Sequence, residues 1–243
     1  MTAINTNMAA LRARNASLNV TAMQEKAMER LSSGKRVNAA ADDAAGLSVA
    51  SKMQSQLKGI NMSIRNGHDG IGLIQTAEAG METIRNMILR IRELAVQMSN
   101  GIYQNNPDRN NADLEVTALL AQIELIADNT KFNGIALLSG GYSQDVQAGP
   151  TTPEKVRIGI ASVSTSGLAI TNGTVSVTGV TASLSTIGLM DTALQTLNTN
   201  MSKLGSLQNR LTYSIQNLSS ASVMTEQALE GLWTLTLPWK PRS

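Results

Sequence analysis

Histidine and cysteine, which commonly bind metals and act in catalysis, are almost absent from this chain. The 243 residues include one histidine, His68, and no cysteine, so the sequence predicts neither a zinc site nor a cysteine nucleophile. Gly67–Gly72 is rich in glycine, but it lies inside a helical pattern with no strand before it. A nucleotide-binding loop needs that strand. We therefore expect these glycines to allow helices to pack closely.

Asp42 and Asp43 are adjacent carboxylates, which in a pocket could exchange protons with a substrate. They stand directly before a long apolar pattern, where aspartates typically cap a helix. An enzyme built on this chain would need a polar cluster in residues 141–183. The charged residues of that stretch are Asp145, Glu154, Lys155 and Arg157. The sequence therefore predicts no catalytic residue, no metal ligand and no cofactor, and a protein that is not an enzyme.

Composition and charge also narrow the class of protein. The net charge is +2 and the cations are spread along the chain, which argues against a nucleic-acid partner. No apolar run is long enough to insert into a membrane. Aromatic residues make up 2% of the chain, which favours a thin core of Leu, Ile, Met and Ala. The first residues do not resemble a conventional secretory signal, so an exported chain would leave the cell by another route.

The longest periodic pattern covers residues 42–99 and predicts one long helix. Apolar or small residues recur there in steps of three and four, which is typical of a helix packed along its length on other helices. Asn100-Gly101 would end it. The residues of this pattern are Leu47, Ala50, Met53, Leu57, Ile60, Ile64, Gly67, Ile71, Ile74, Ala77, Met81, Ile84, Ile88, Ile91, Leu94 and Met98.

Three further stretches have a helical period. Residues 184–229 repeat the long pattern and would pack antiparallel to residues 42–99. Residues 111–128 form a third helix with one stripe of Leu114, Ala118, Ala121 and Leu125, widened by Val116, Leu119, Ile123 and Ile126. Residues 4–31 form a terminal helix that Gly34 would end, with a narrower stripe made of Ile4, Met8, Leu11 and Leu18.

Residues 130–183 are rich in Gly, Thr and Ser and predict a small β region of two to four strands. Val156–Ile160 and Thr174–Thr178 alternate like short strands, and Asn172-Gly173 is a hairpin signal. The fold class is mainly α, a long antiparallel helical hairpin or bundle with a small β-rich insert.

Several segments of this pattern resemble bacterial flagellin. They are MTAINTN at 1–7, LSSGKRVNAAADDAAGLSVASKM at 31–53, IRNGHDGIGLIQTAEAGM at 64–81, ILRIRELAVQMSNG at 88–101, NTKFNG at 129–134 and LGSLQNRLTYSIQNL at 204–218. The resemblance covers about residues 1–140 and 184–229, and the intervening insert falls where flagellins vary.

The resemblance implies a structural subunit of the flagellar filament. Such a subunit leaves the cell through the flagellar type III export machinery and polymerises with other flagellin subunits under a cap, next to hook-junction proteins. It would be extracellular and serve motility. The implied domains are 1–42 (terminal helix and linker of the inner domain), 43–140 (middle-domain helices and start of the β region), 141–183 (variable insert), 184–229 (returning helix) and 230–243 (aberrant tail).

Arg90, Leu94 and Glu115 match the flagellin residues that the animal Toll-like receptor for flagellin recognises. In the family the same surface makes subunit contacts, so these residues could serve both. The alternative is that Leu94 is a core residue and Arg90 a solvated charge. An alternative function therefore stays open: the chain could be a soluble, non-polymerising flagellin fragment that acts as a ligand of this innate immune receptor.

The chain departs from the family after residue 229. Flagellins continue with a segment of the Asp-Ala-Asp-Phe-Ala type and a further helix, whereas this chain has LWTLTLPWKPRS. One set of codons for Glu230–Pro241, read from its third base, encodes GVVDADFAMET. We therefore hypothesise a frameshift, with a natural short tail as the alternative. The stripe on residues 4–31 would then lack its partner helix, which predicts a folded middle domain, a frayed terminal helix and weakened assembly.

Overall fold

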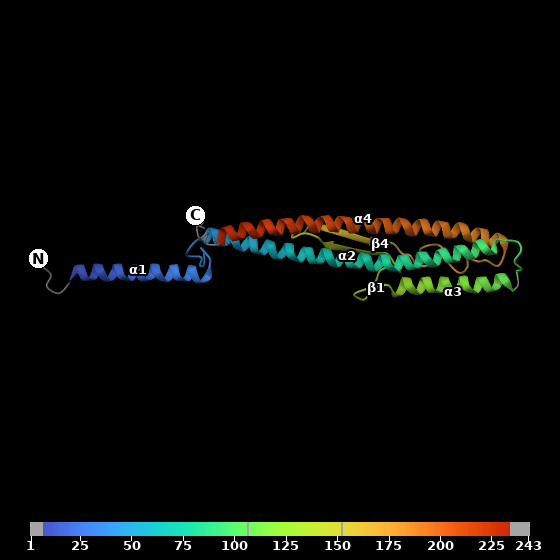
Figure 1. Cartoon of the computed structure of the whole chain (residues 1–243), viewed down its shortest axis with the longest axis horizontal. Coiled ribbons are helices and arrows are strands. Elements are labelled where there is room, and N and C mark those ends of the chain that lie inside the picture. Colours follow the sequence, from blue (N-terminus) through green and yellow to red (C-terminus); the bar gives the residue numbers. More distant parts are fainter. Residues whose placement is uncertain (1–6, 106, 152, 234–243) are drawn as a thin grey trace, which may run out of the picture. The chain divides into compact units, whose positions relative to one another are not determined.

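The computed structural model describes residues 7–105, 107–151 and 153–233. Its helices are α1 (Met8–Ser33), α2 (Ala44–Met98), α3 (Asp108–Asn129) and α4 (Val180–Trp233), and its strands are β1 (Lys131–Phe132), β2 (Ile135–Ala136), β3 (Tyr142–Gln147) and β4 (Lys155–Ile160) (Figure 1). The chain divides into two compact units, one made of residues up to Ile60 and from Ser220 onward, the other of Asn61–Ser219. We call them unit 1 and unit 2.

Unit 2 is built on α2 and α4, which run antiparallel. A Cβ added at Gly67 would lie 2.8 Å from Cγ1 of Ile215, so the two helices approach closely there. Towards the other end of the unit, Arg92 Nε on α2 lies 2.7 Å from Asp191 Oδ1 on α4. Residue numbers thus fall along α4 as they rise along α2, as the two long periodic patterns predict.

The core of unit 2 follows the predicted stripe of α2. From Ile74 to Met98 every predicted member of that stripe is buried. These side chains pack with Met190, Ala193, Leu197, Leu204 and Leu211 of α4, with Val116, Leu120 and Ile123 of α3, and with Val156, Ile158 and Ile160 of β4. The core is therefore aliphatic, as the low aromatic content indicates.

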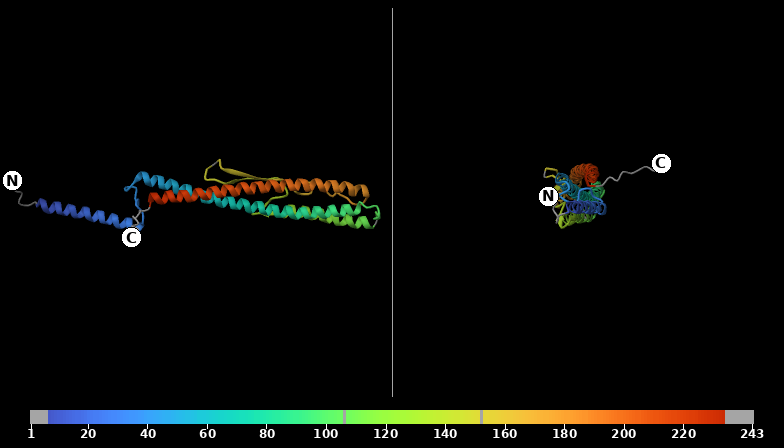
Figure 2. Two further views of the ribbon diagram at one scale, coloured as in Figure 1. Left: turned by 45° about the horizontal axis from the view of Figure 1, so that its top comes forward. Right: turned by 90° about the vertical axis from the view of Figure 1, so that its left-hand side faces the viewer.

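Helix α3 lies beside α2 in the two side-on views (Figures 1 and 2), and it corrects one prediction. The first-named stripe is exposed, with Leu114 at 70% and Leu125 at 53% of full exposure, whereas Val116 and Ile123, which the prediction placed beside it, are buried. The buried face carries Arg109, Ala112, Val116, Leu120, Ile123 and Ala127. Helix α3 is apolar on two faces, and the sequence period alone does not say which of them packs on the core.

The β region consists of two antiparallel pairs. Strands β1 and β2 are joined by Asn133 and Gly134, whose positive φ angles of 49° and 79° suit a tight hairpin turn. Strands β3 and β4 pair from Tyr142 opposite Ile160 to Gln147 opposite Lys155. The strand predicted at Val156–Ile160 is confirmed.

The strand predicted at Thr174–Thr178 is wrong, and Asn172-Gly173 lies in a turn that joins no strands. The backbone there bonds to side chains of neighbouring helices. Val177 N–H donates to Asp113 Oδ1 over 2.9 Å, and Ser176 N–H donates to Thr186 Oγ1 over 3.2 Å. Val175 and Val177 alternate with polar residues because both valines are buried in the core. The side chains of Asp113 and Thr186 accept the backbone hydrogen bonds that a neighbouring strand would otherwise accept.

Unit 1 contains α1, the loop after it, and the ends of α2 and α4. Asn7 Oδ1 caps α1 by accepting from the N–H groups of Ala9 and Ala10, and Gly34 ends it with φ 67°. Asp43 Oδ1 accepts from Gly46 N–H over 2.8 Å, which confirms it as the cap of α2.

Asp42 is also structural, but in the loop between α1 and α2. Its carboxylate accepts from the N–H groups of Asn38 and Ala39 and pairs with Lys26 and Arg30 of α1. These bonds, led by the one from Lys26, lower the pKa of Asp42 to about 2.

Helix α4 runs past its predicted end at Leu229 to Trp233. The backbone N–H of Arg36 donates to the Trp233 carbonyl over 2.6 Å, and its guanidinium Nη2 donates to the Leu232 carbonyl over 3.4 Å. Lys35 Nζ lies 4.1 Å from the centroid of the Trp233 ring. Two cations therefore stand at the negative end of this helix. The rest of the tail, residues 234–243, lies outside the described residues. Across the described part of the chain, no helix has the length and hydropathy to cross a membrane.

Candidate functional site

The structure brings Arg90, Leu94 and Glu115 together on one side of the α2–α3 pair. Arg90 Nε on α2 donates to Glu115 Oε1 on α3 over 2.9 Å. The side chains of Arg90 and Glu115 are 50% and 45% exposed. The antiparallel hairpin therefore places residues that are 25 positions apart into one accessible ion pair.

Arg90 has a second acidic neighbour one turn further along α2. Its Nη1 lies 3.4 Å from Glu93 Oε2. The hydrogen bond and charge of Glu115, followed by those of Glu93, raise the pKa of Arg90 above its usual value. The guanidinium is thus held by two carboxylates and is not a simple solvated charge.

Leu94 is only 4% exposed and belongs to the core of unit 2. It lines a depression of about 420 Å³ together with the polar residues Arg90, Gln97, Tyr103, Asp108, Asn111 and Glu115. The alternative that Leu94 is a core residue therefore agrees with its burial, and its part in any interface stays a prediction.

Arg109 is a positioning residue that the sequence analysis missed. It is 4% exposed, and its guanidinium donates to the carbonyls of Met98 (3.2 Å) and Asn100 (3.0 Å) and to Asn105 Oδ1. It thus satisfies carbonyls at the C-terminal end of α2 from the first turn of α3. An arginine closely following a helix stop was the signal available in the sequence.

The predicted assembly stripe on α1 has no partner in the described part of the chain. Helix α1 has no buried residue, and Met8, Leu11 and Leu18 are exposed. Ile4 lies outside the described residues. The other large apolar residues exposed on this helix are Val20, Met23, Met28 and Leu31.

The remaining candidates have structural roles or none. His68 is exposed on α2, and no cluster of three or more potential metal ligands occurs among the described residues. Gly67 and Gly70 face Ile215 and Leu211 of α4, which confirms that glycines in this segment allow close helix packing.

Comparison with known proteins agrees with this architecture. The family model described as the bacterial flagellin N-terminal helical region matches residues 4–143, and that of the flagellin C-terminal helical region matches residues 187–233. Flagellin from Halalkalibacterium halodurans is 39% identical over 223 residues, covering 90% of this chain and 80% of that protein. Flagellin FlaB1 from Treponema pallidum is 34% identical over 234 residues, covering 90% and 82%.

A solved structure gives the same assignment. The crystal structure of Bacillus cereus flagellin matches with a TM-score of 0.55 and 30% identity, covering 63% of this chain and 88% of that one. This chain is a member of the bacterial flagellin family.

Proposed function

We propose that this chain is a structural subunit of the bacterial flagellar filament and assembles with copies of itself outside the cell. The observation that carries the proposal is the match of both flagellin helical regions, residues 4–143 and 187–233. The exposed apolar side chains of α1 support it, because they have no partner within the described chain and copies could cover them. The role is mechanical and needs no catalytic group.

Assembly of the purified chain tests this proposal. The chain is dispersed to monomers, concentrated and followed by light scattering, sedimentation and negative-stain microscopy. A matched variant has residues 230–243 replaced by the corresponding C-terminal segment of the Halalkalibacterium halodurans relative. We expect filaments from the variant at lower concentration than from the natural chain, because the tail of this chain predicts weakened assembly. If neither protein forms filaments, the proposed function is contradicted.

The finer partners are part of the same proposal. Export through the flagellar type III machinery, growth under a cap and contact with hook-junction proteins would accompany the filament role. Secretion assays that follow this chain in a strain lacking the export gate test the first of these. The chain should then stay in the cell and leave it when the gate is restored.

The α2–α3 face would serve as a contact surface. Arg90 and Glu115 are half-exposed and adjacent, which suits an interface for a second subunit or for an innate immune receptor. We expect Arg90→Ala to weaken binding to a flagellin-recognising Toll-like receptor, with Arg65→Ala, an exposed arginine on the same helix, as control. Equal binding by both variants would remove Arg90 from the proposed receptor site.

A further inference from the structure

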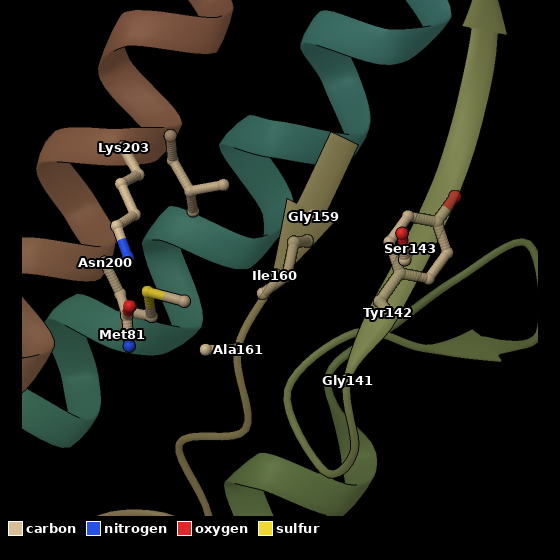
Figure 3. Close-up of a pocket in the computed structure, with 10 residues that line it drawn as sticks. Met81, Gly141, Tyr142, Ser143, Gly159, Ile160, Ala161, Asn200 and Lys203 are labelled. Carbon is tan, nitrogen blue, oxygen red and sulfur yellow. The ribbon is translucent and has the colours of Figure 1, made fainter. Parts of the chain in front are cut away.

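Two polar side chains of unit 2 are buried in unusual surroundings. Asn200 lines a hollow of about 330 Å³ beside the β3–β4 hairpin (Figure 3), and its Nδ2 is buried with no acceptor among the described residues. A group from outside cannot reach that atom. Arg109 is also buried, but it lies at the turn between α2 and α3, next to residues that solvent reaches. A buried charge and an exposed backbone therefore meet at this turn.

Arg109 has only neutral hydrogen-bond partners among the described residues. Its guanidinium donates to the carbonyls of Met98 and Asn100 and to Oδ1 of Asn105. None of the ion pairs between described residues includes it. Buried arginines in proteins are nearly always paired with an anion. This turn therefore holds a buried cation that lacks a carboxylate.

Asn100 can become that carboxylate by its own chemistry. It is followed by Gly101, and an Asn-Gly pair converts in water through a cyclic imide, because glycine has no side chain to hinder ring closure. The Gly101 nitrogen, after losing its proton to a base in the solvent, bonds to Cγ of Asn100. The bond from Cγ to Nδ2 then breaks and releases ammonia. Water finally opens the ring at one of its two carbonyl carbons, so that one amide and one water give one carboxylate and one ammonium ion.

The turn favours ring closure at Asn100. Asn100 and Gly101 are both exposed, and the N–H of Gly101 donates to no described residue. The N–H of Ile102 donates to Asn100 Oδ1 over 3.3 Å. This donor polarises Cγ and stabilises the negative charge that develops on Oδ1 during the attack. Asn66-Gly67, in contrast, lies inside α2, where the helical hydrogen bonds hold its peptide groups.

Arg109 then favours one direction of ring opening. Its Nη2 donates to the main-chain carbonyl oxygen of Asn100 over 3.0 Å. A charged donor stabilises a developing oxyanion more than the neutral N–H of Ile102 does at the side-chain oxygen. Water should therefore add to the main-chain carbonyl carbon and break its bond to the Gly101 nitrogen. The chain then continues through Cγ as isoaspartate, and the former main-chain carbonyl becomes a carboxylate beside Arg109.

We propose that Asn100-Gly101 is a self-modification site, at which Asn100 converts to isoaspartate and the new carboxylate pairs with Arg109. The C-terminal end of a helix disfavours a negative charge, so a carboxylate at the end of α2 needs the cation that Arg109 provides. The conversion requires no enzyme and lowers the net charge of the chain from +2 to +1, because one neutral amide becomes one carboxylate. It is independent of the proposed filament role.

Incubation of the full-length chain at neutral pH tests the site. After digestion at mildly acidic pH, mass spectrometry follows amide loss at each Asn-Gly pair, with synthetic peptides identifying isoaspartate and aspartate. We expect Asn100 to convert about tenfold faster than Asn66. Its isoaspartate share should exceed that of Asn172, whose carbonyl has no cationic donor among the described residues. In urea the two shares should become equal, because unfolding removes Arg109 from Asn100.

Variants separate the two steps. Gly101→Ala should slow conversion of Asn100 about tenfold, and it should leave the fold intact because a Cβ at Gly101 meets nothing within 4 Å. Gly173→Ala is equally open and is the matched control, which should leave conversion of Asn100 unchanged. Arg109→Met should lower the isoaspartate share at Asn100 to that at Asn172. The comparison between folded and urea-denatured natural chain gives the same test if this variant misfolds.

The outcomes are distinguishable. If Asn100 keeps its amide while Asn172 loses it, the self-modification site is overturned. If Asn100 converts with the same isoaspartate share in the folded and the denatured chain, the role of Arg109 is overturned. Neither readout depends on whether the chain forms filaments, so this inference and the proposed function can fail separately.

Discussion

Arg109 shows how one side chain can hold a helical hairpin closed. Its guanidinium donates to the carbonyl of Met98, the last residue of α2, and to the carbonyl of Asn100, two residues beyond the helix. The Arg109 side chain is almost fully buried. A buried arginine without such acceptors would destabilise the fold, since burial removes its hydration. The guanidinium thus replaces water at the helix end and joins α2 to α3.

Replacing Arg109 by methionine should therefore destabilise unit 2. The change keeps a long apolar stem but removes the donors, so the buried Met98 carbonyl loses the hydrogen bond that Arg109 gives it. We expect a loss of about 2–4 kcal/mol in the free energy of unfolding, measured by urea denaturation. Arg65→Met, which changes an exposed arginine on α2, is the matched control and should be near neutral. Equal stability of both variants would show that the Arg109 bonds are dispensable.

Asp42 makes the stability of the loop between α1 and α2 depend on pH. Its pKa is lowered to about 2 in the folded chain from an ordinary value of 3.8. A lowered pKa means that the carboxylate stabilises the folded loop above pH 3.8, and that this contribution disappears as the pH falls towards 2. The amide protons of Asn38 and Ala39, which bond to Asp42, report this change directly.

We expect the NMR shifts of those two amides to titrate with a midpoint near pH 2. In Asp42→Asn, which keeps the shape but loses the charge, the same amides should show no such transition. A midpoint near 3.8 in the natural chain would mean that the lysine and backbone bonds do not hold the carboxylate.

At the scale of the elements, the sequence predicts helices far better than it predicts which faces meet. The stripes of α2 and α4 follow one period for many turns, so their existence and their pairing are evident. Helix α3 has two apolar faces, and the predicted main stripe with Leu114 and Leu125 is exposed, whereas Val116 and Ile123 at its side are buried. Long-range packing decides between such faces, and no local pattern records it.

The candidate site shows the same limit. Arg90 and Glu115 are named by the resemblance, whereas their 2.9 Å ion pair depends on the register of the α2–α3 hairpin. Residues Thr174–Thr178 alternate as a strand would, yet their backbone bonds to Asp113 and Thr186 instead. A side chain from another element can replace a strand partner, and this replacement cannot be read from the segment alone.

The close approach of α2 and α4 at glycine residues leads to a third prediction. A Cβ at Gly67 would approach Ile215 Cγ1 to 2.8 Å, whereas a Cβ at Gly205 meets nothing within 4 Å. Gly67→Ala should therefore lower the free energy of unfolding by about 1–3 kcal/mol through overpacking. Gly205→Ala should raise it by about 0.5–1 kcal/mol, because alanine favours the helix. Thermal unfolding of both variants checks that the two changes in the free energy of unfolding have opposite signs. If Gly67→Ala stabilises the protein, then Ile215 of α4 moves aside to make room for the added methyl group.

At the scale of the whole molecule, we expect stability and assembly to depend on different parts of the chain. Unit 2 contains nearly all of the buried apolar residues, whereas α1 contains none. We therefore expect the folding of unit 2 not to depend on the apolar side chains of α1, so that their proposed role in contacts between copies can be tested separately.

Removing residues 1–33 should separate the two properties. We expect the urea midpoint of unit 2 to stay within experimental error, because none of the residues of α1 is buried. Filament formation should disappear in sedimentation and microscopy. A control that replaces Met8, Leu11 and Leu18 by serine keeps the helix and should show the same loss of filaments. A marked fall in the urea midpoint after the deletion would mean that α1 supports the core.

The notch at Gly67 also bears on sliding between the two long helices. A heptad pattern by itself is compatible with a shift of seven residues, since apolar positions would again meet apolar positions. Here the side chains of Leu211 and Ile215 fit against Gly70 and Gly67, and Arg92 meets Asp191 farther along. A slipped pair would place these bulky residues against larger neighbours and separate the opposite charges. Small residues at fixed points thus give a repetitive interface a single alignment.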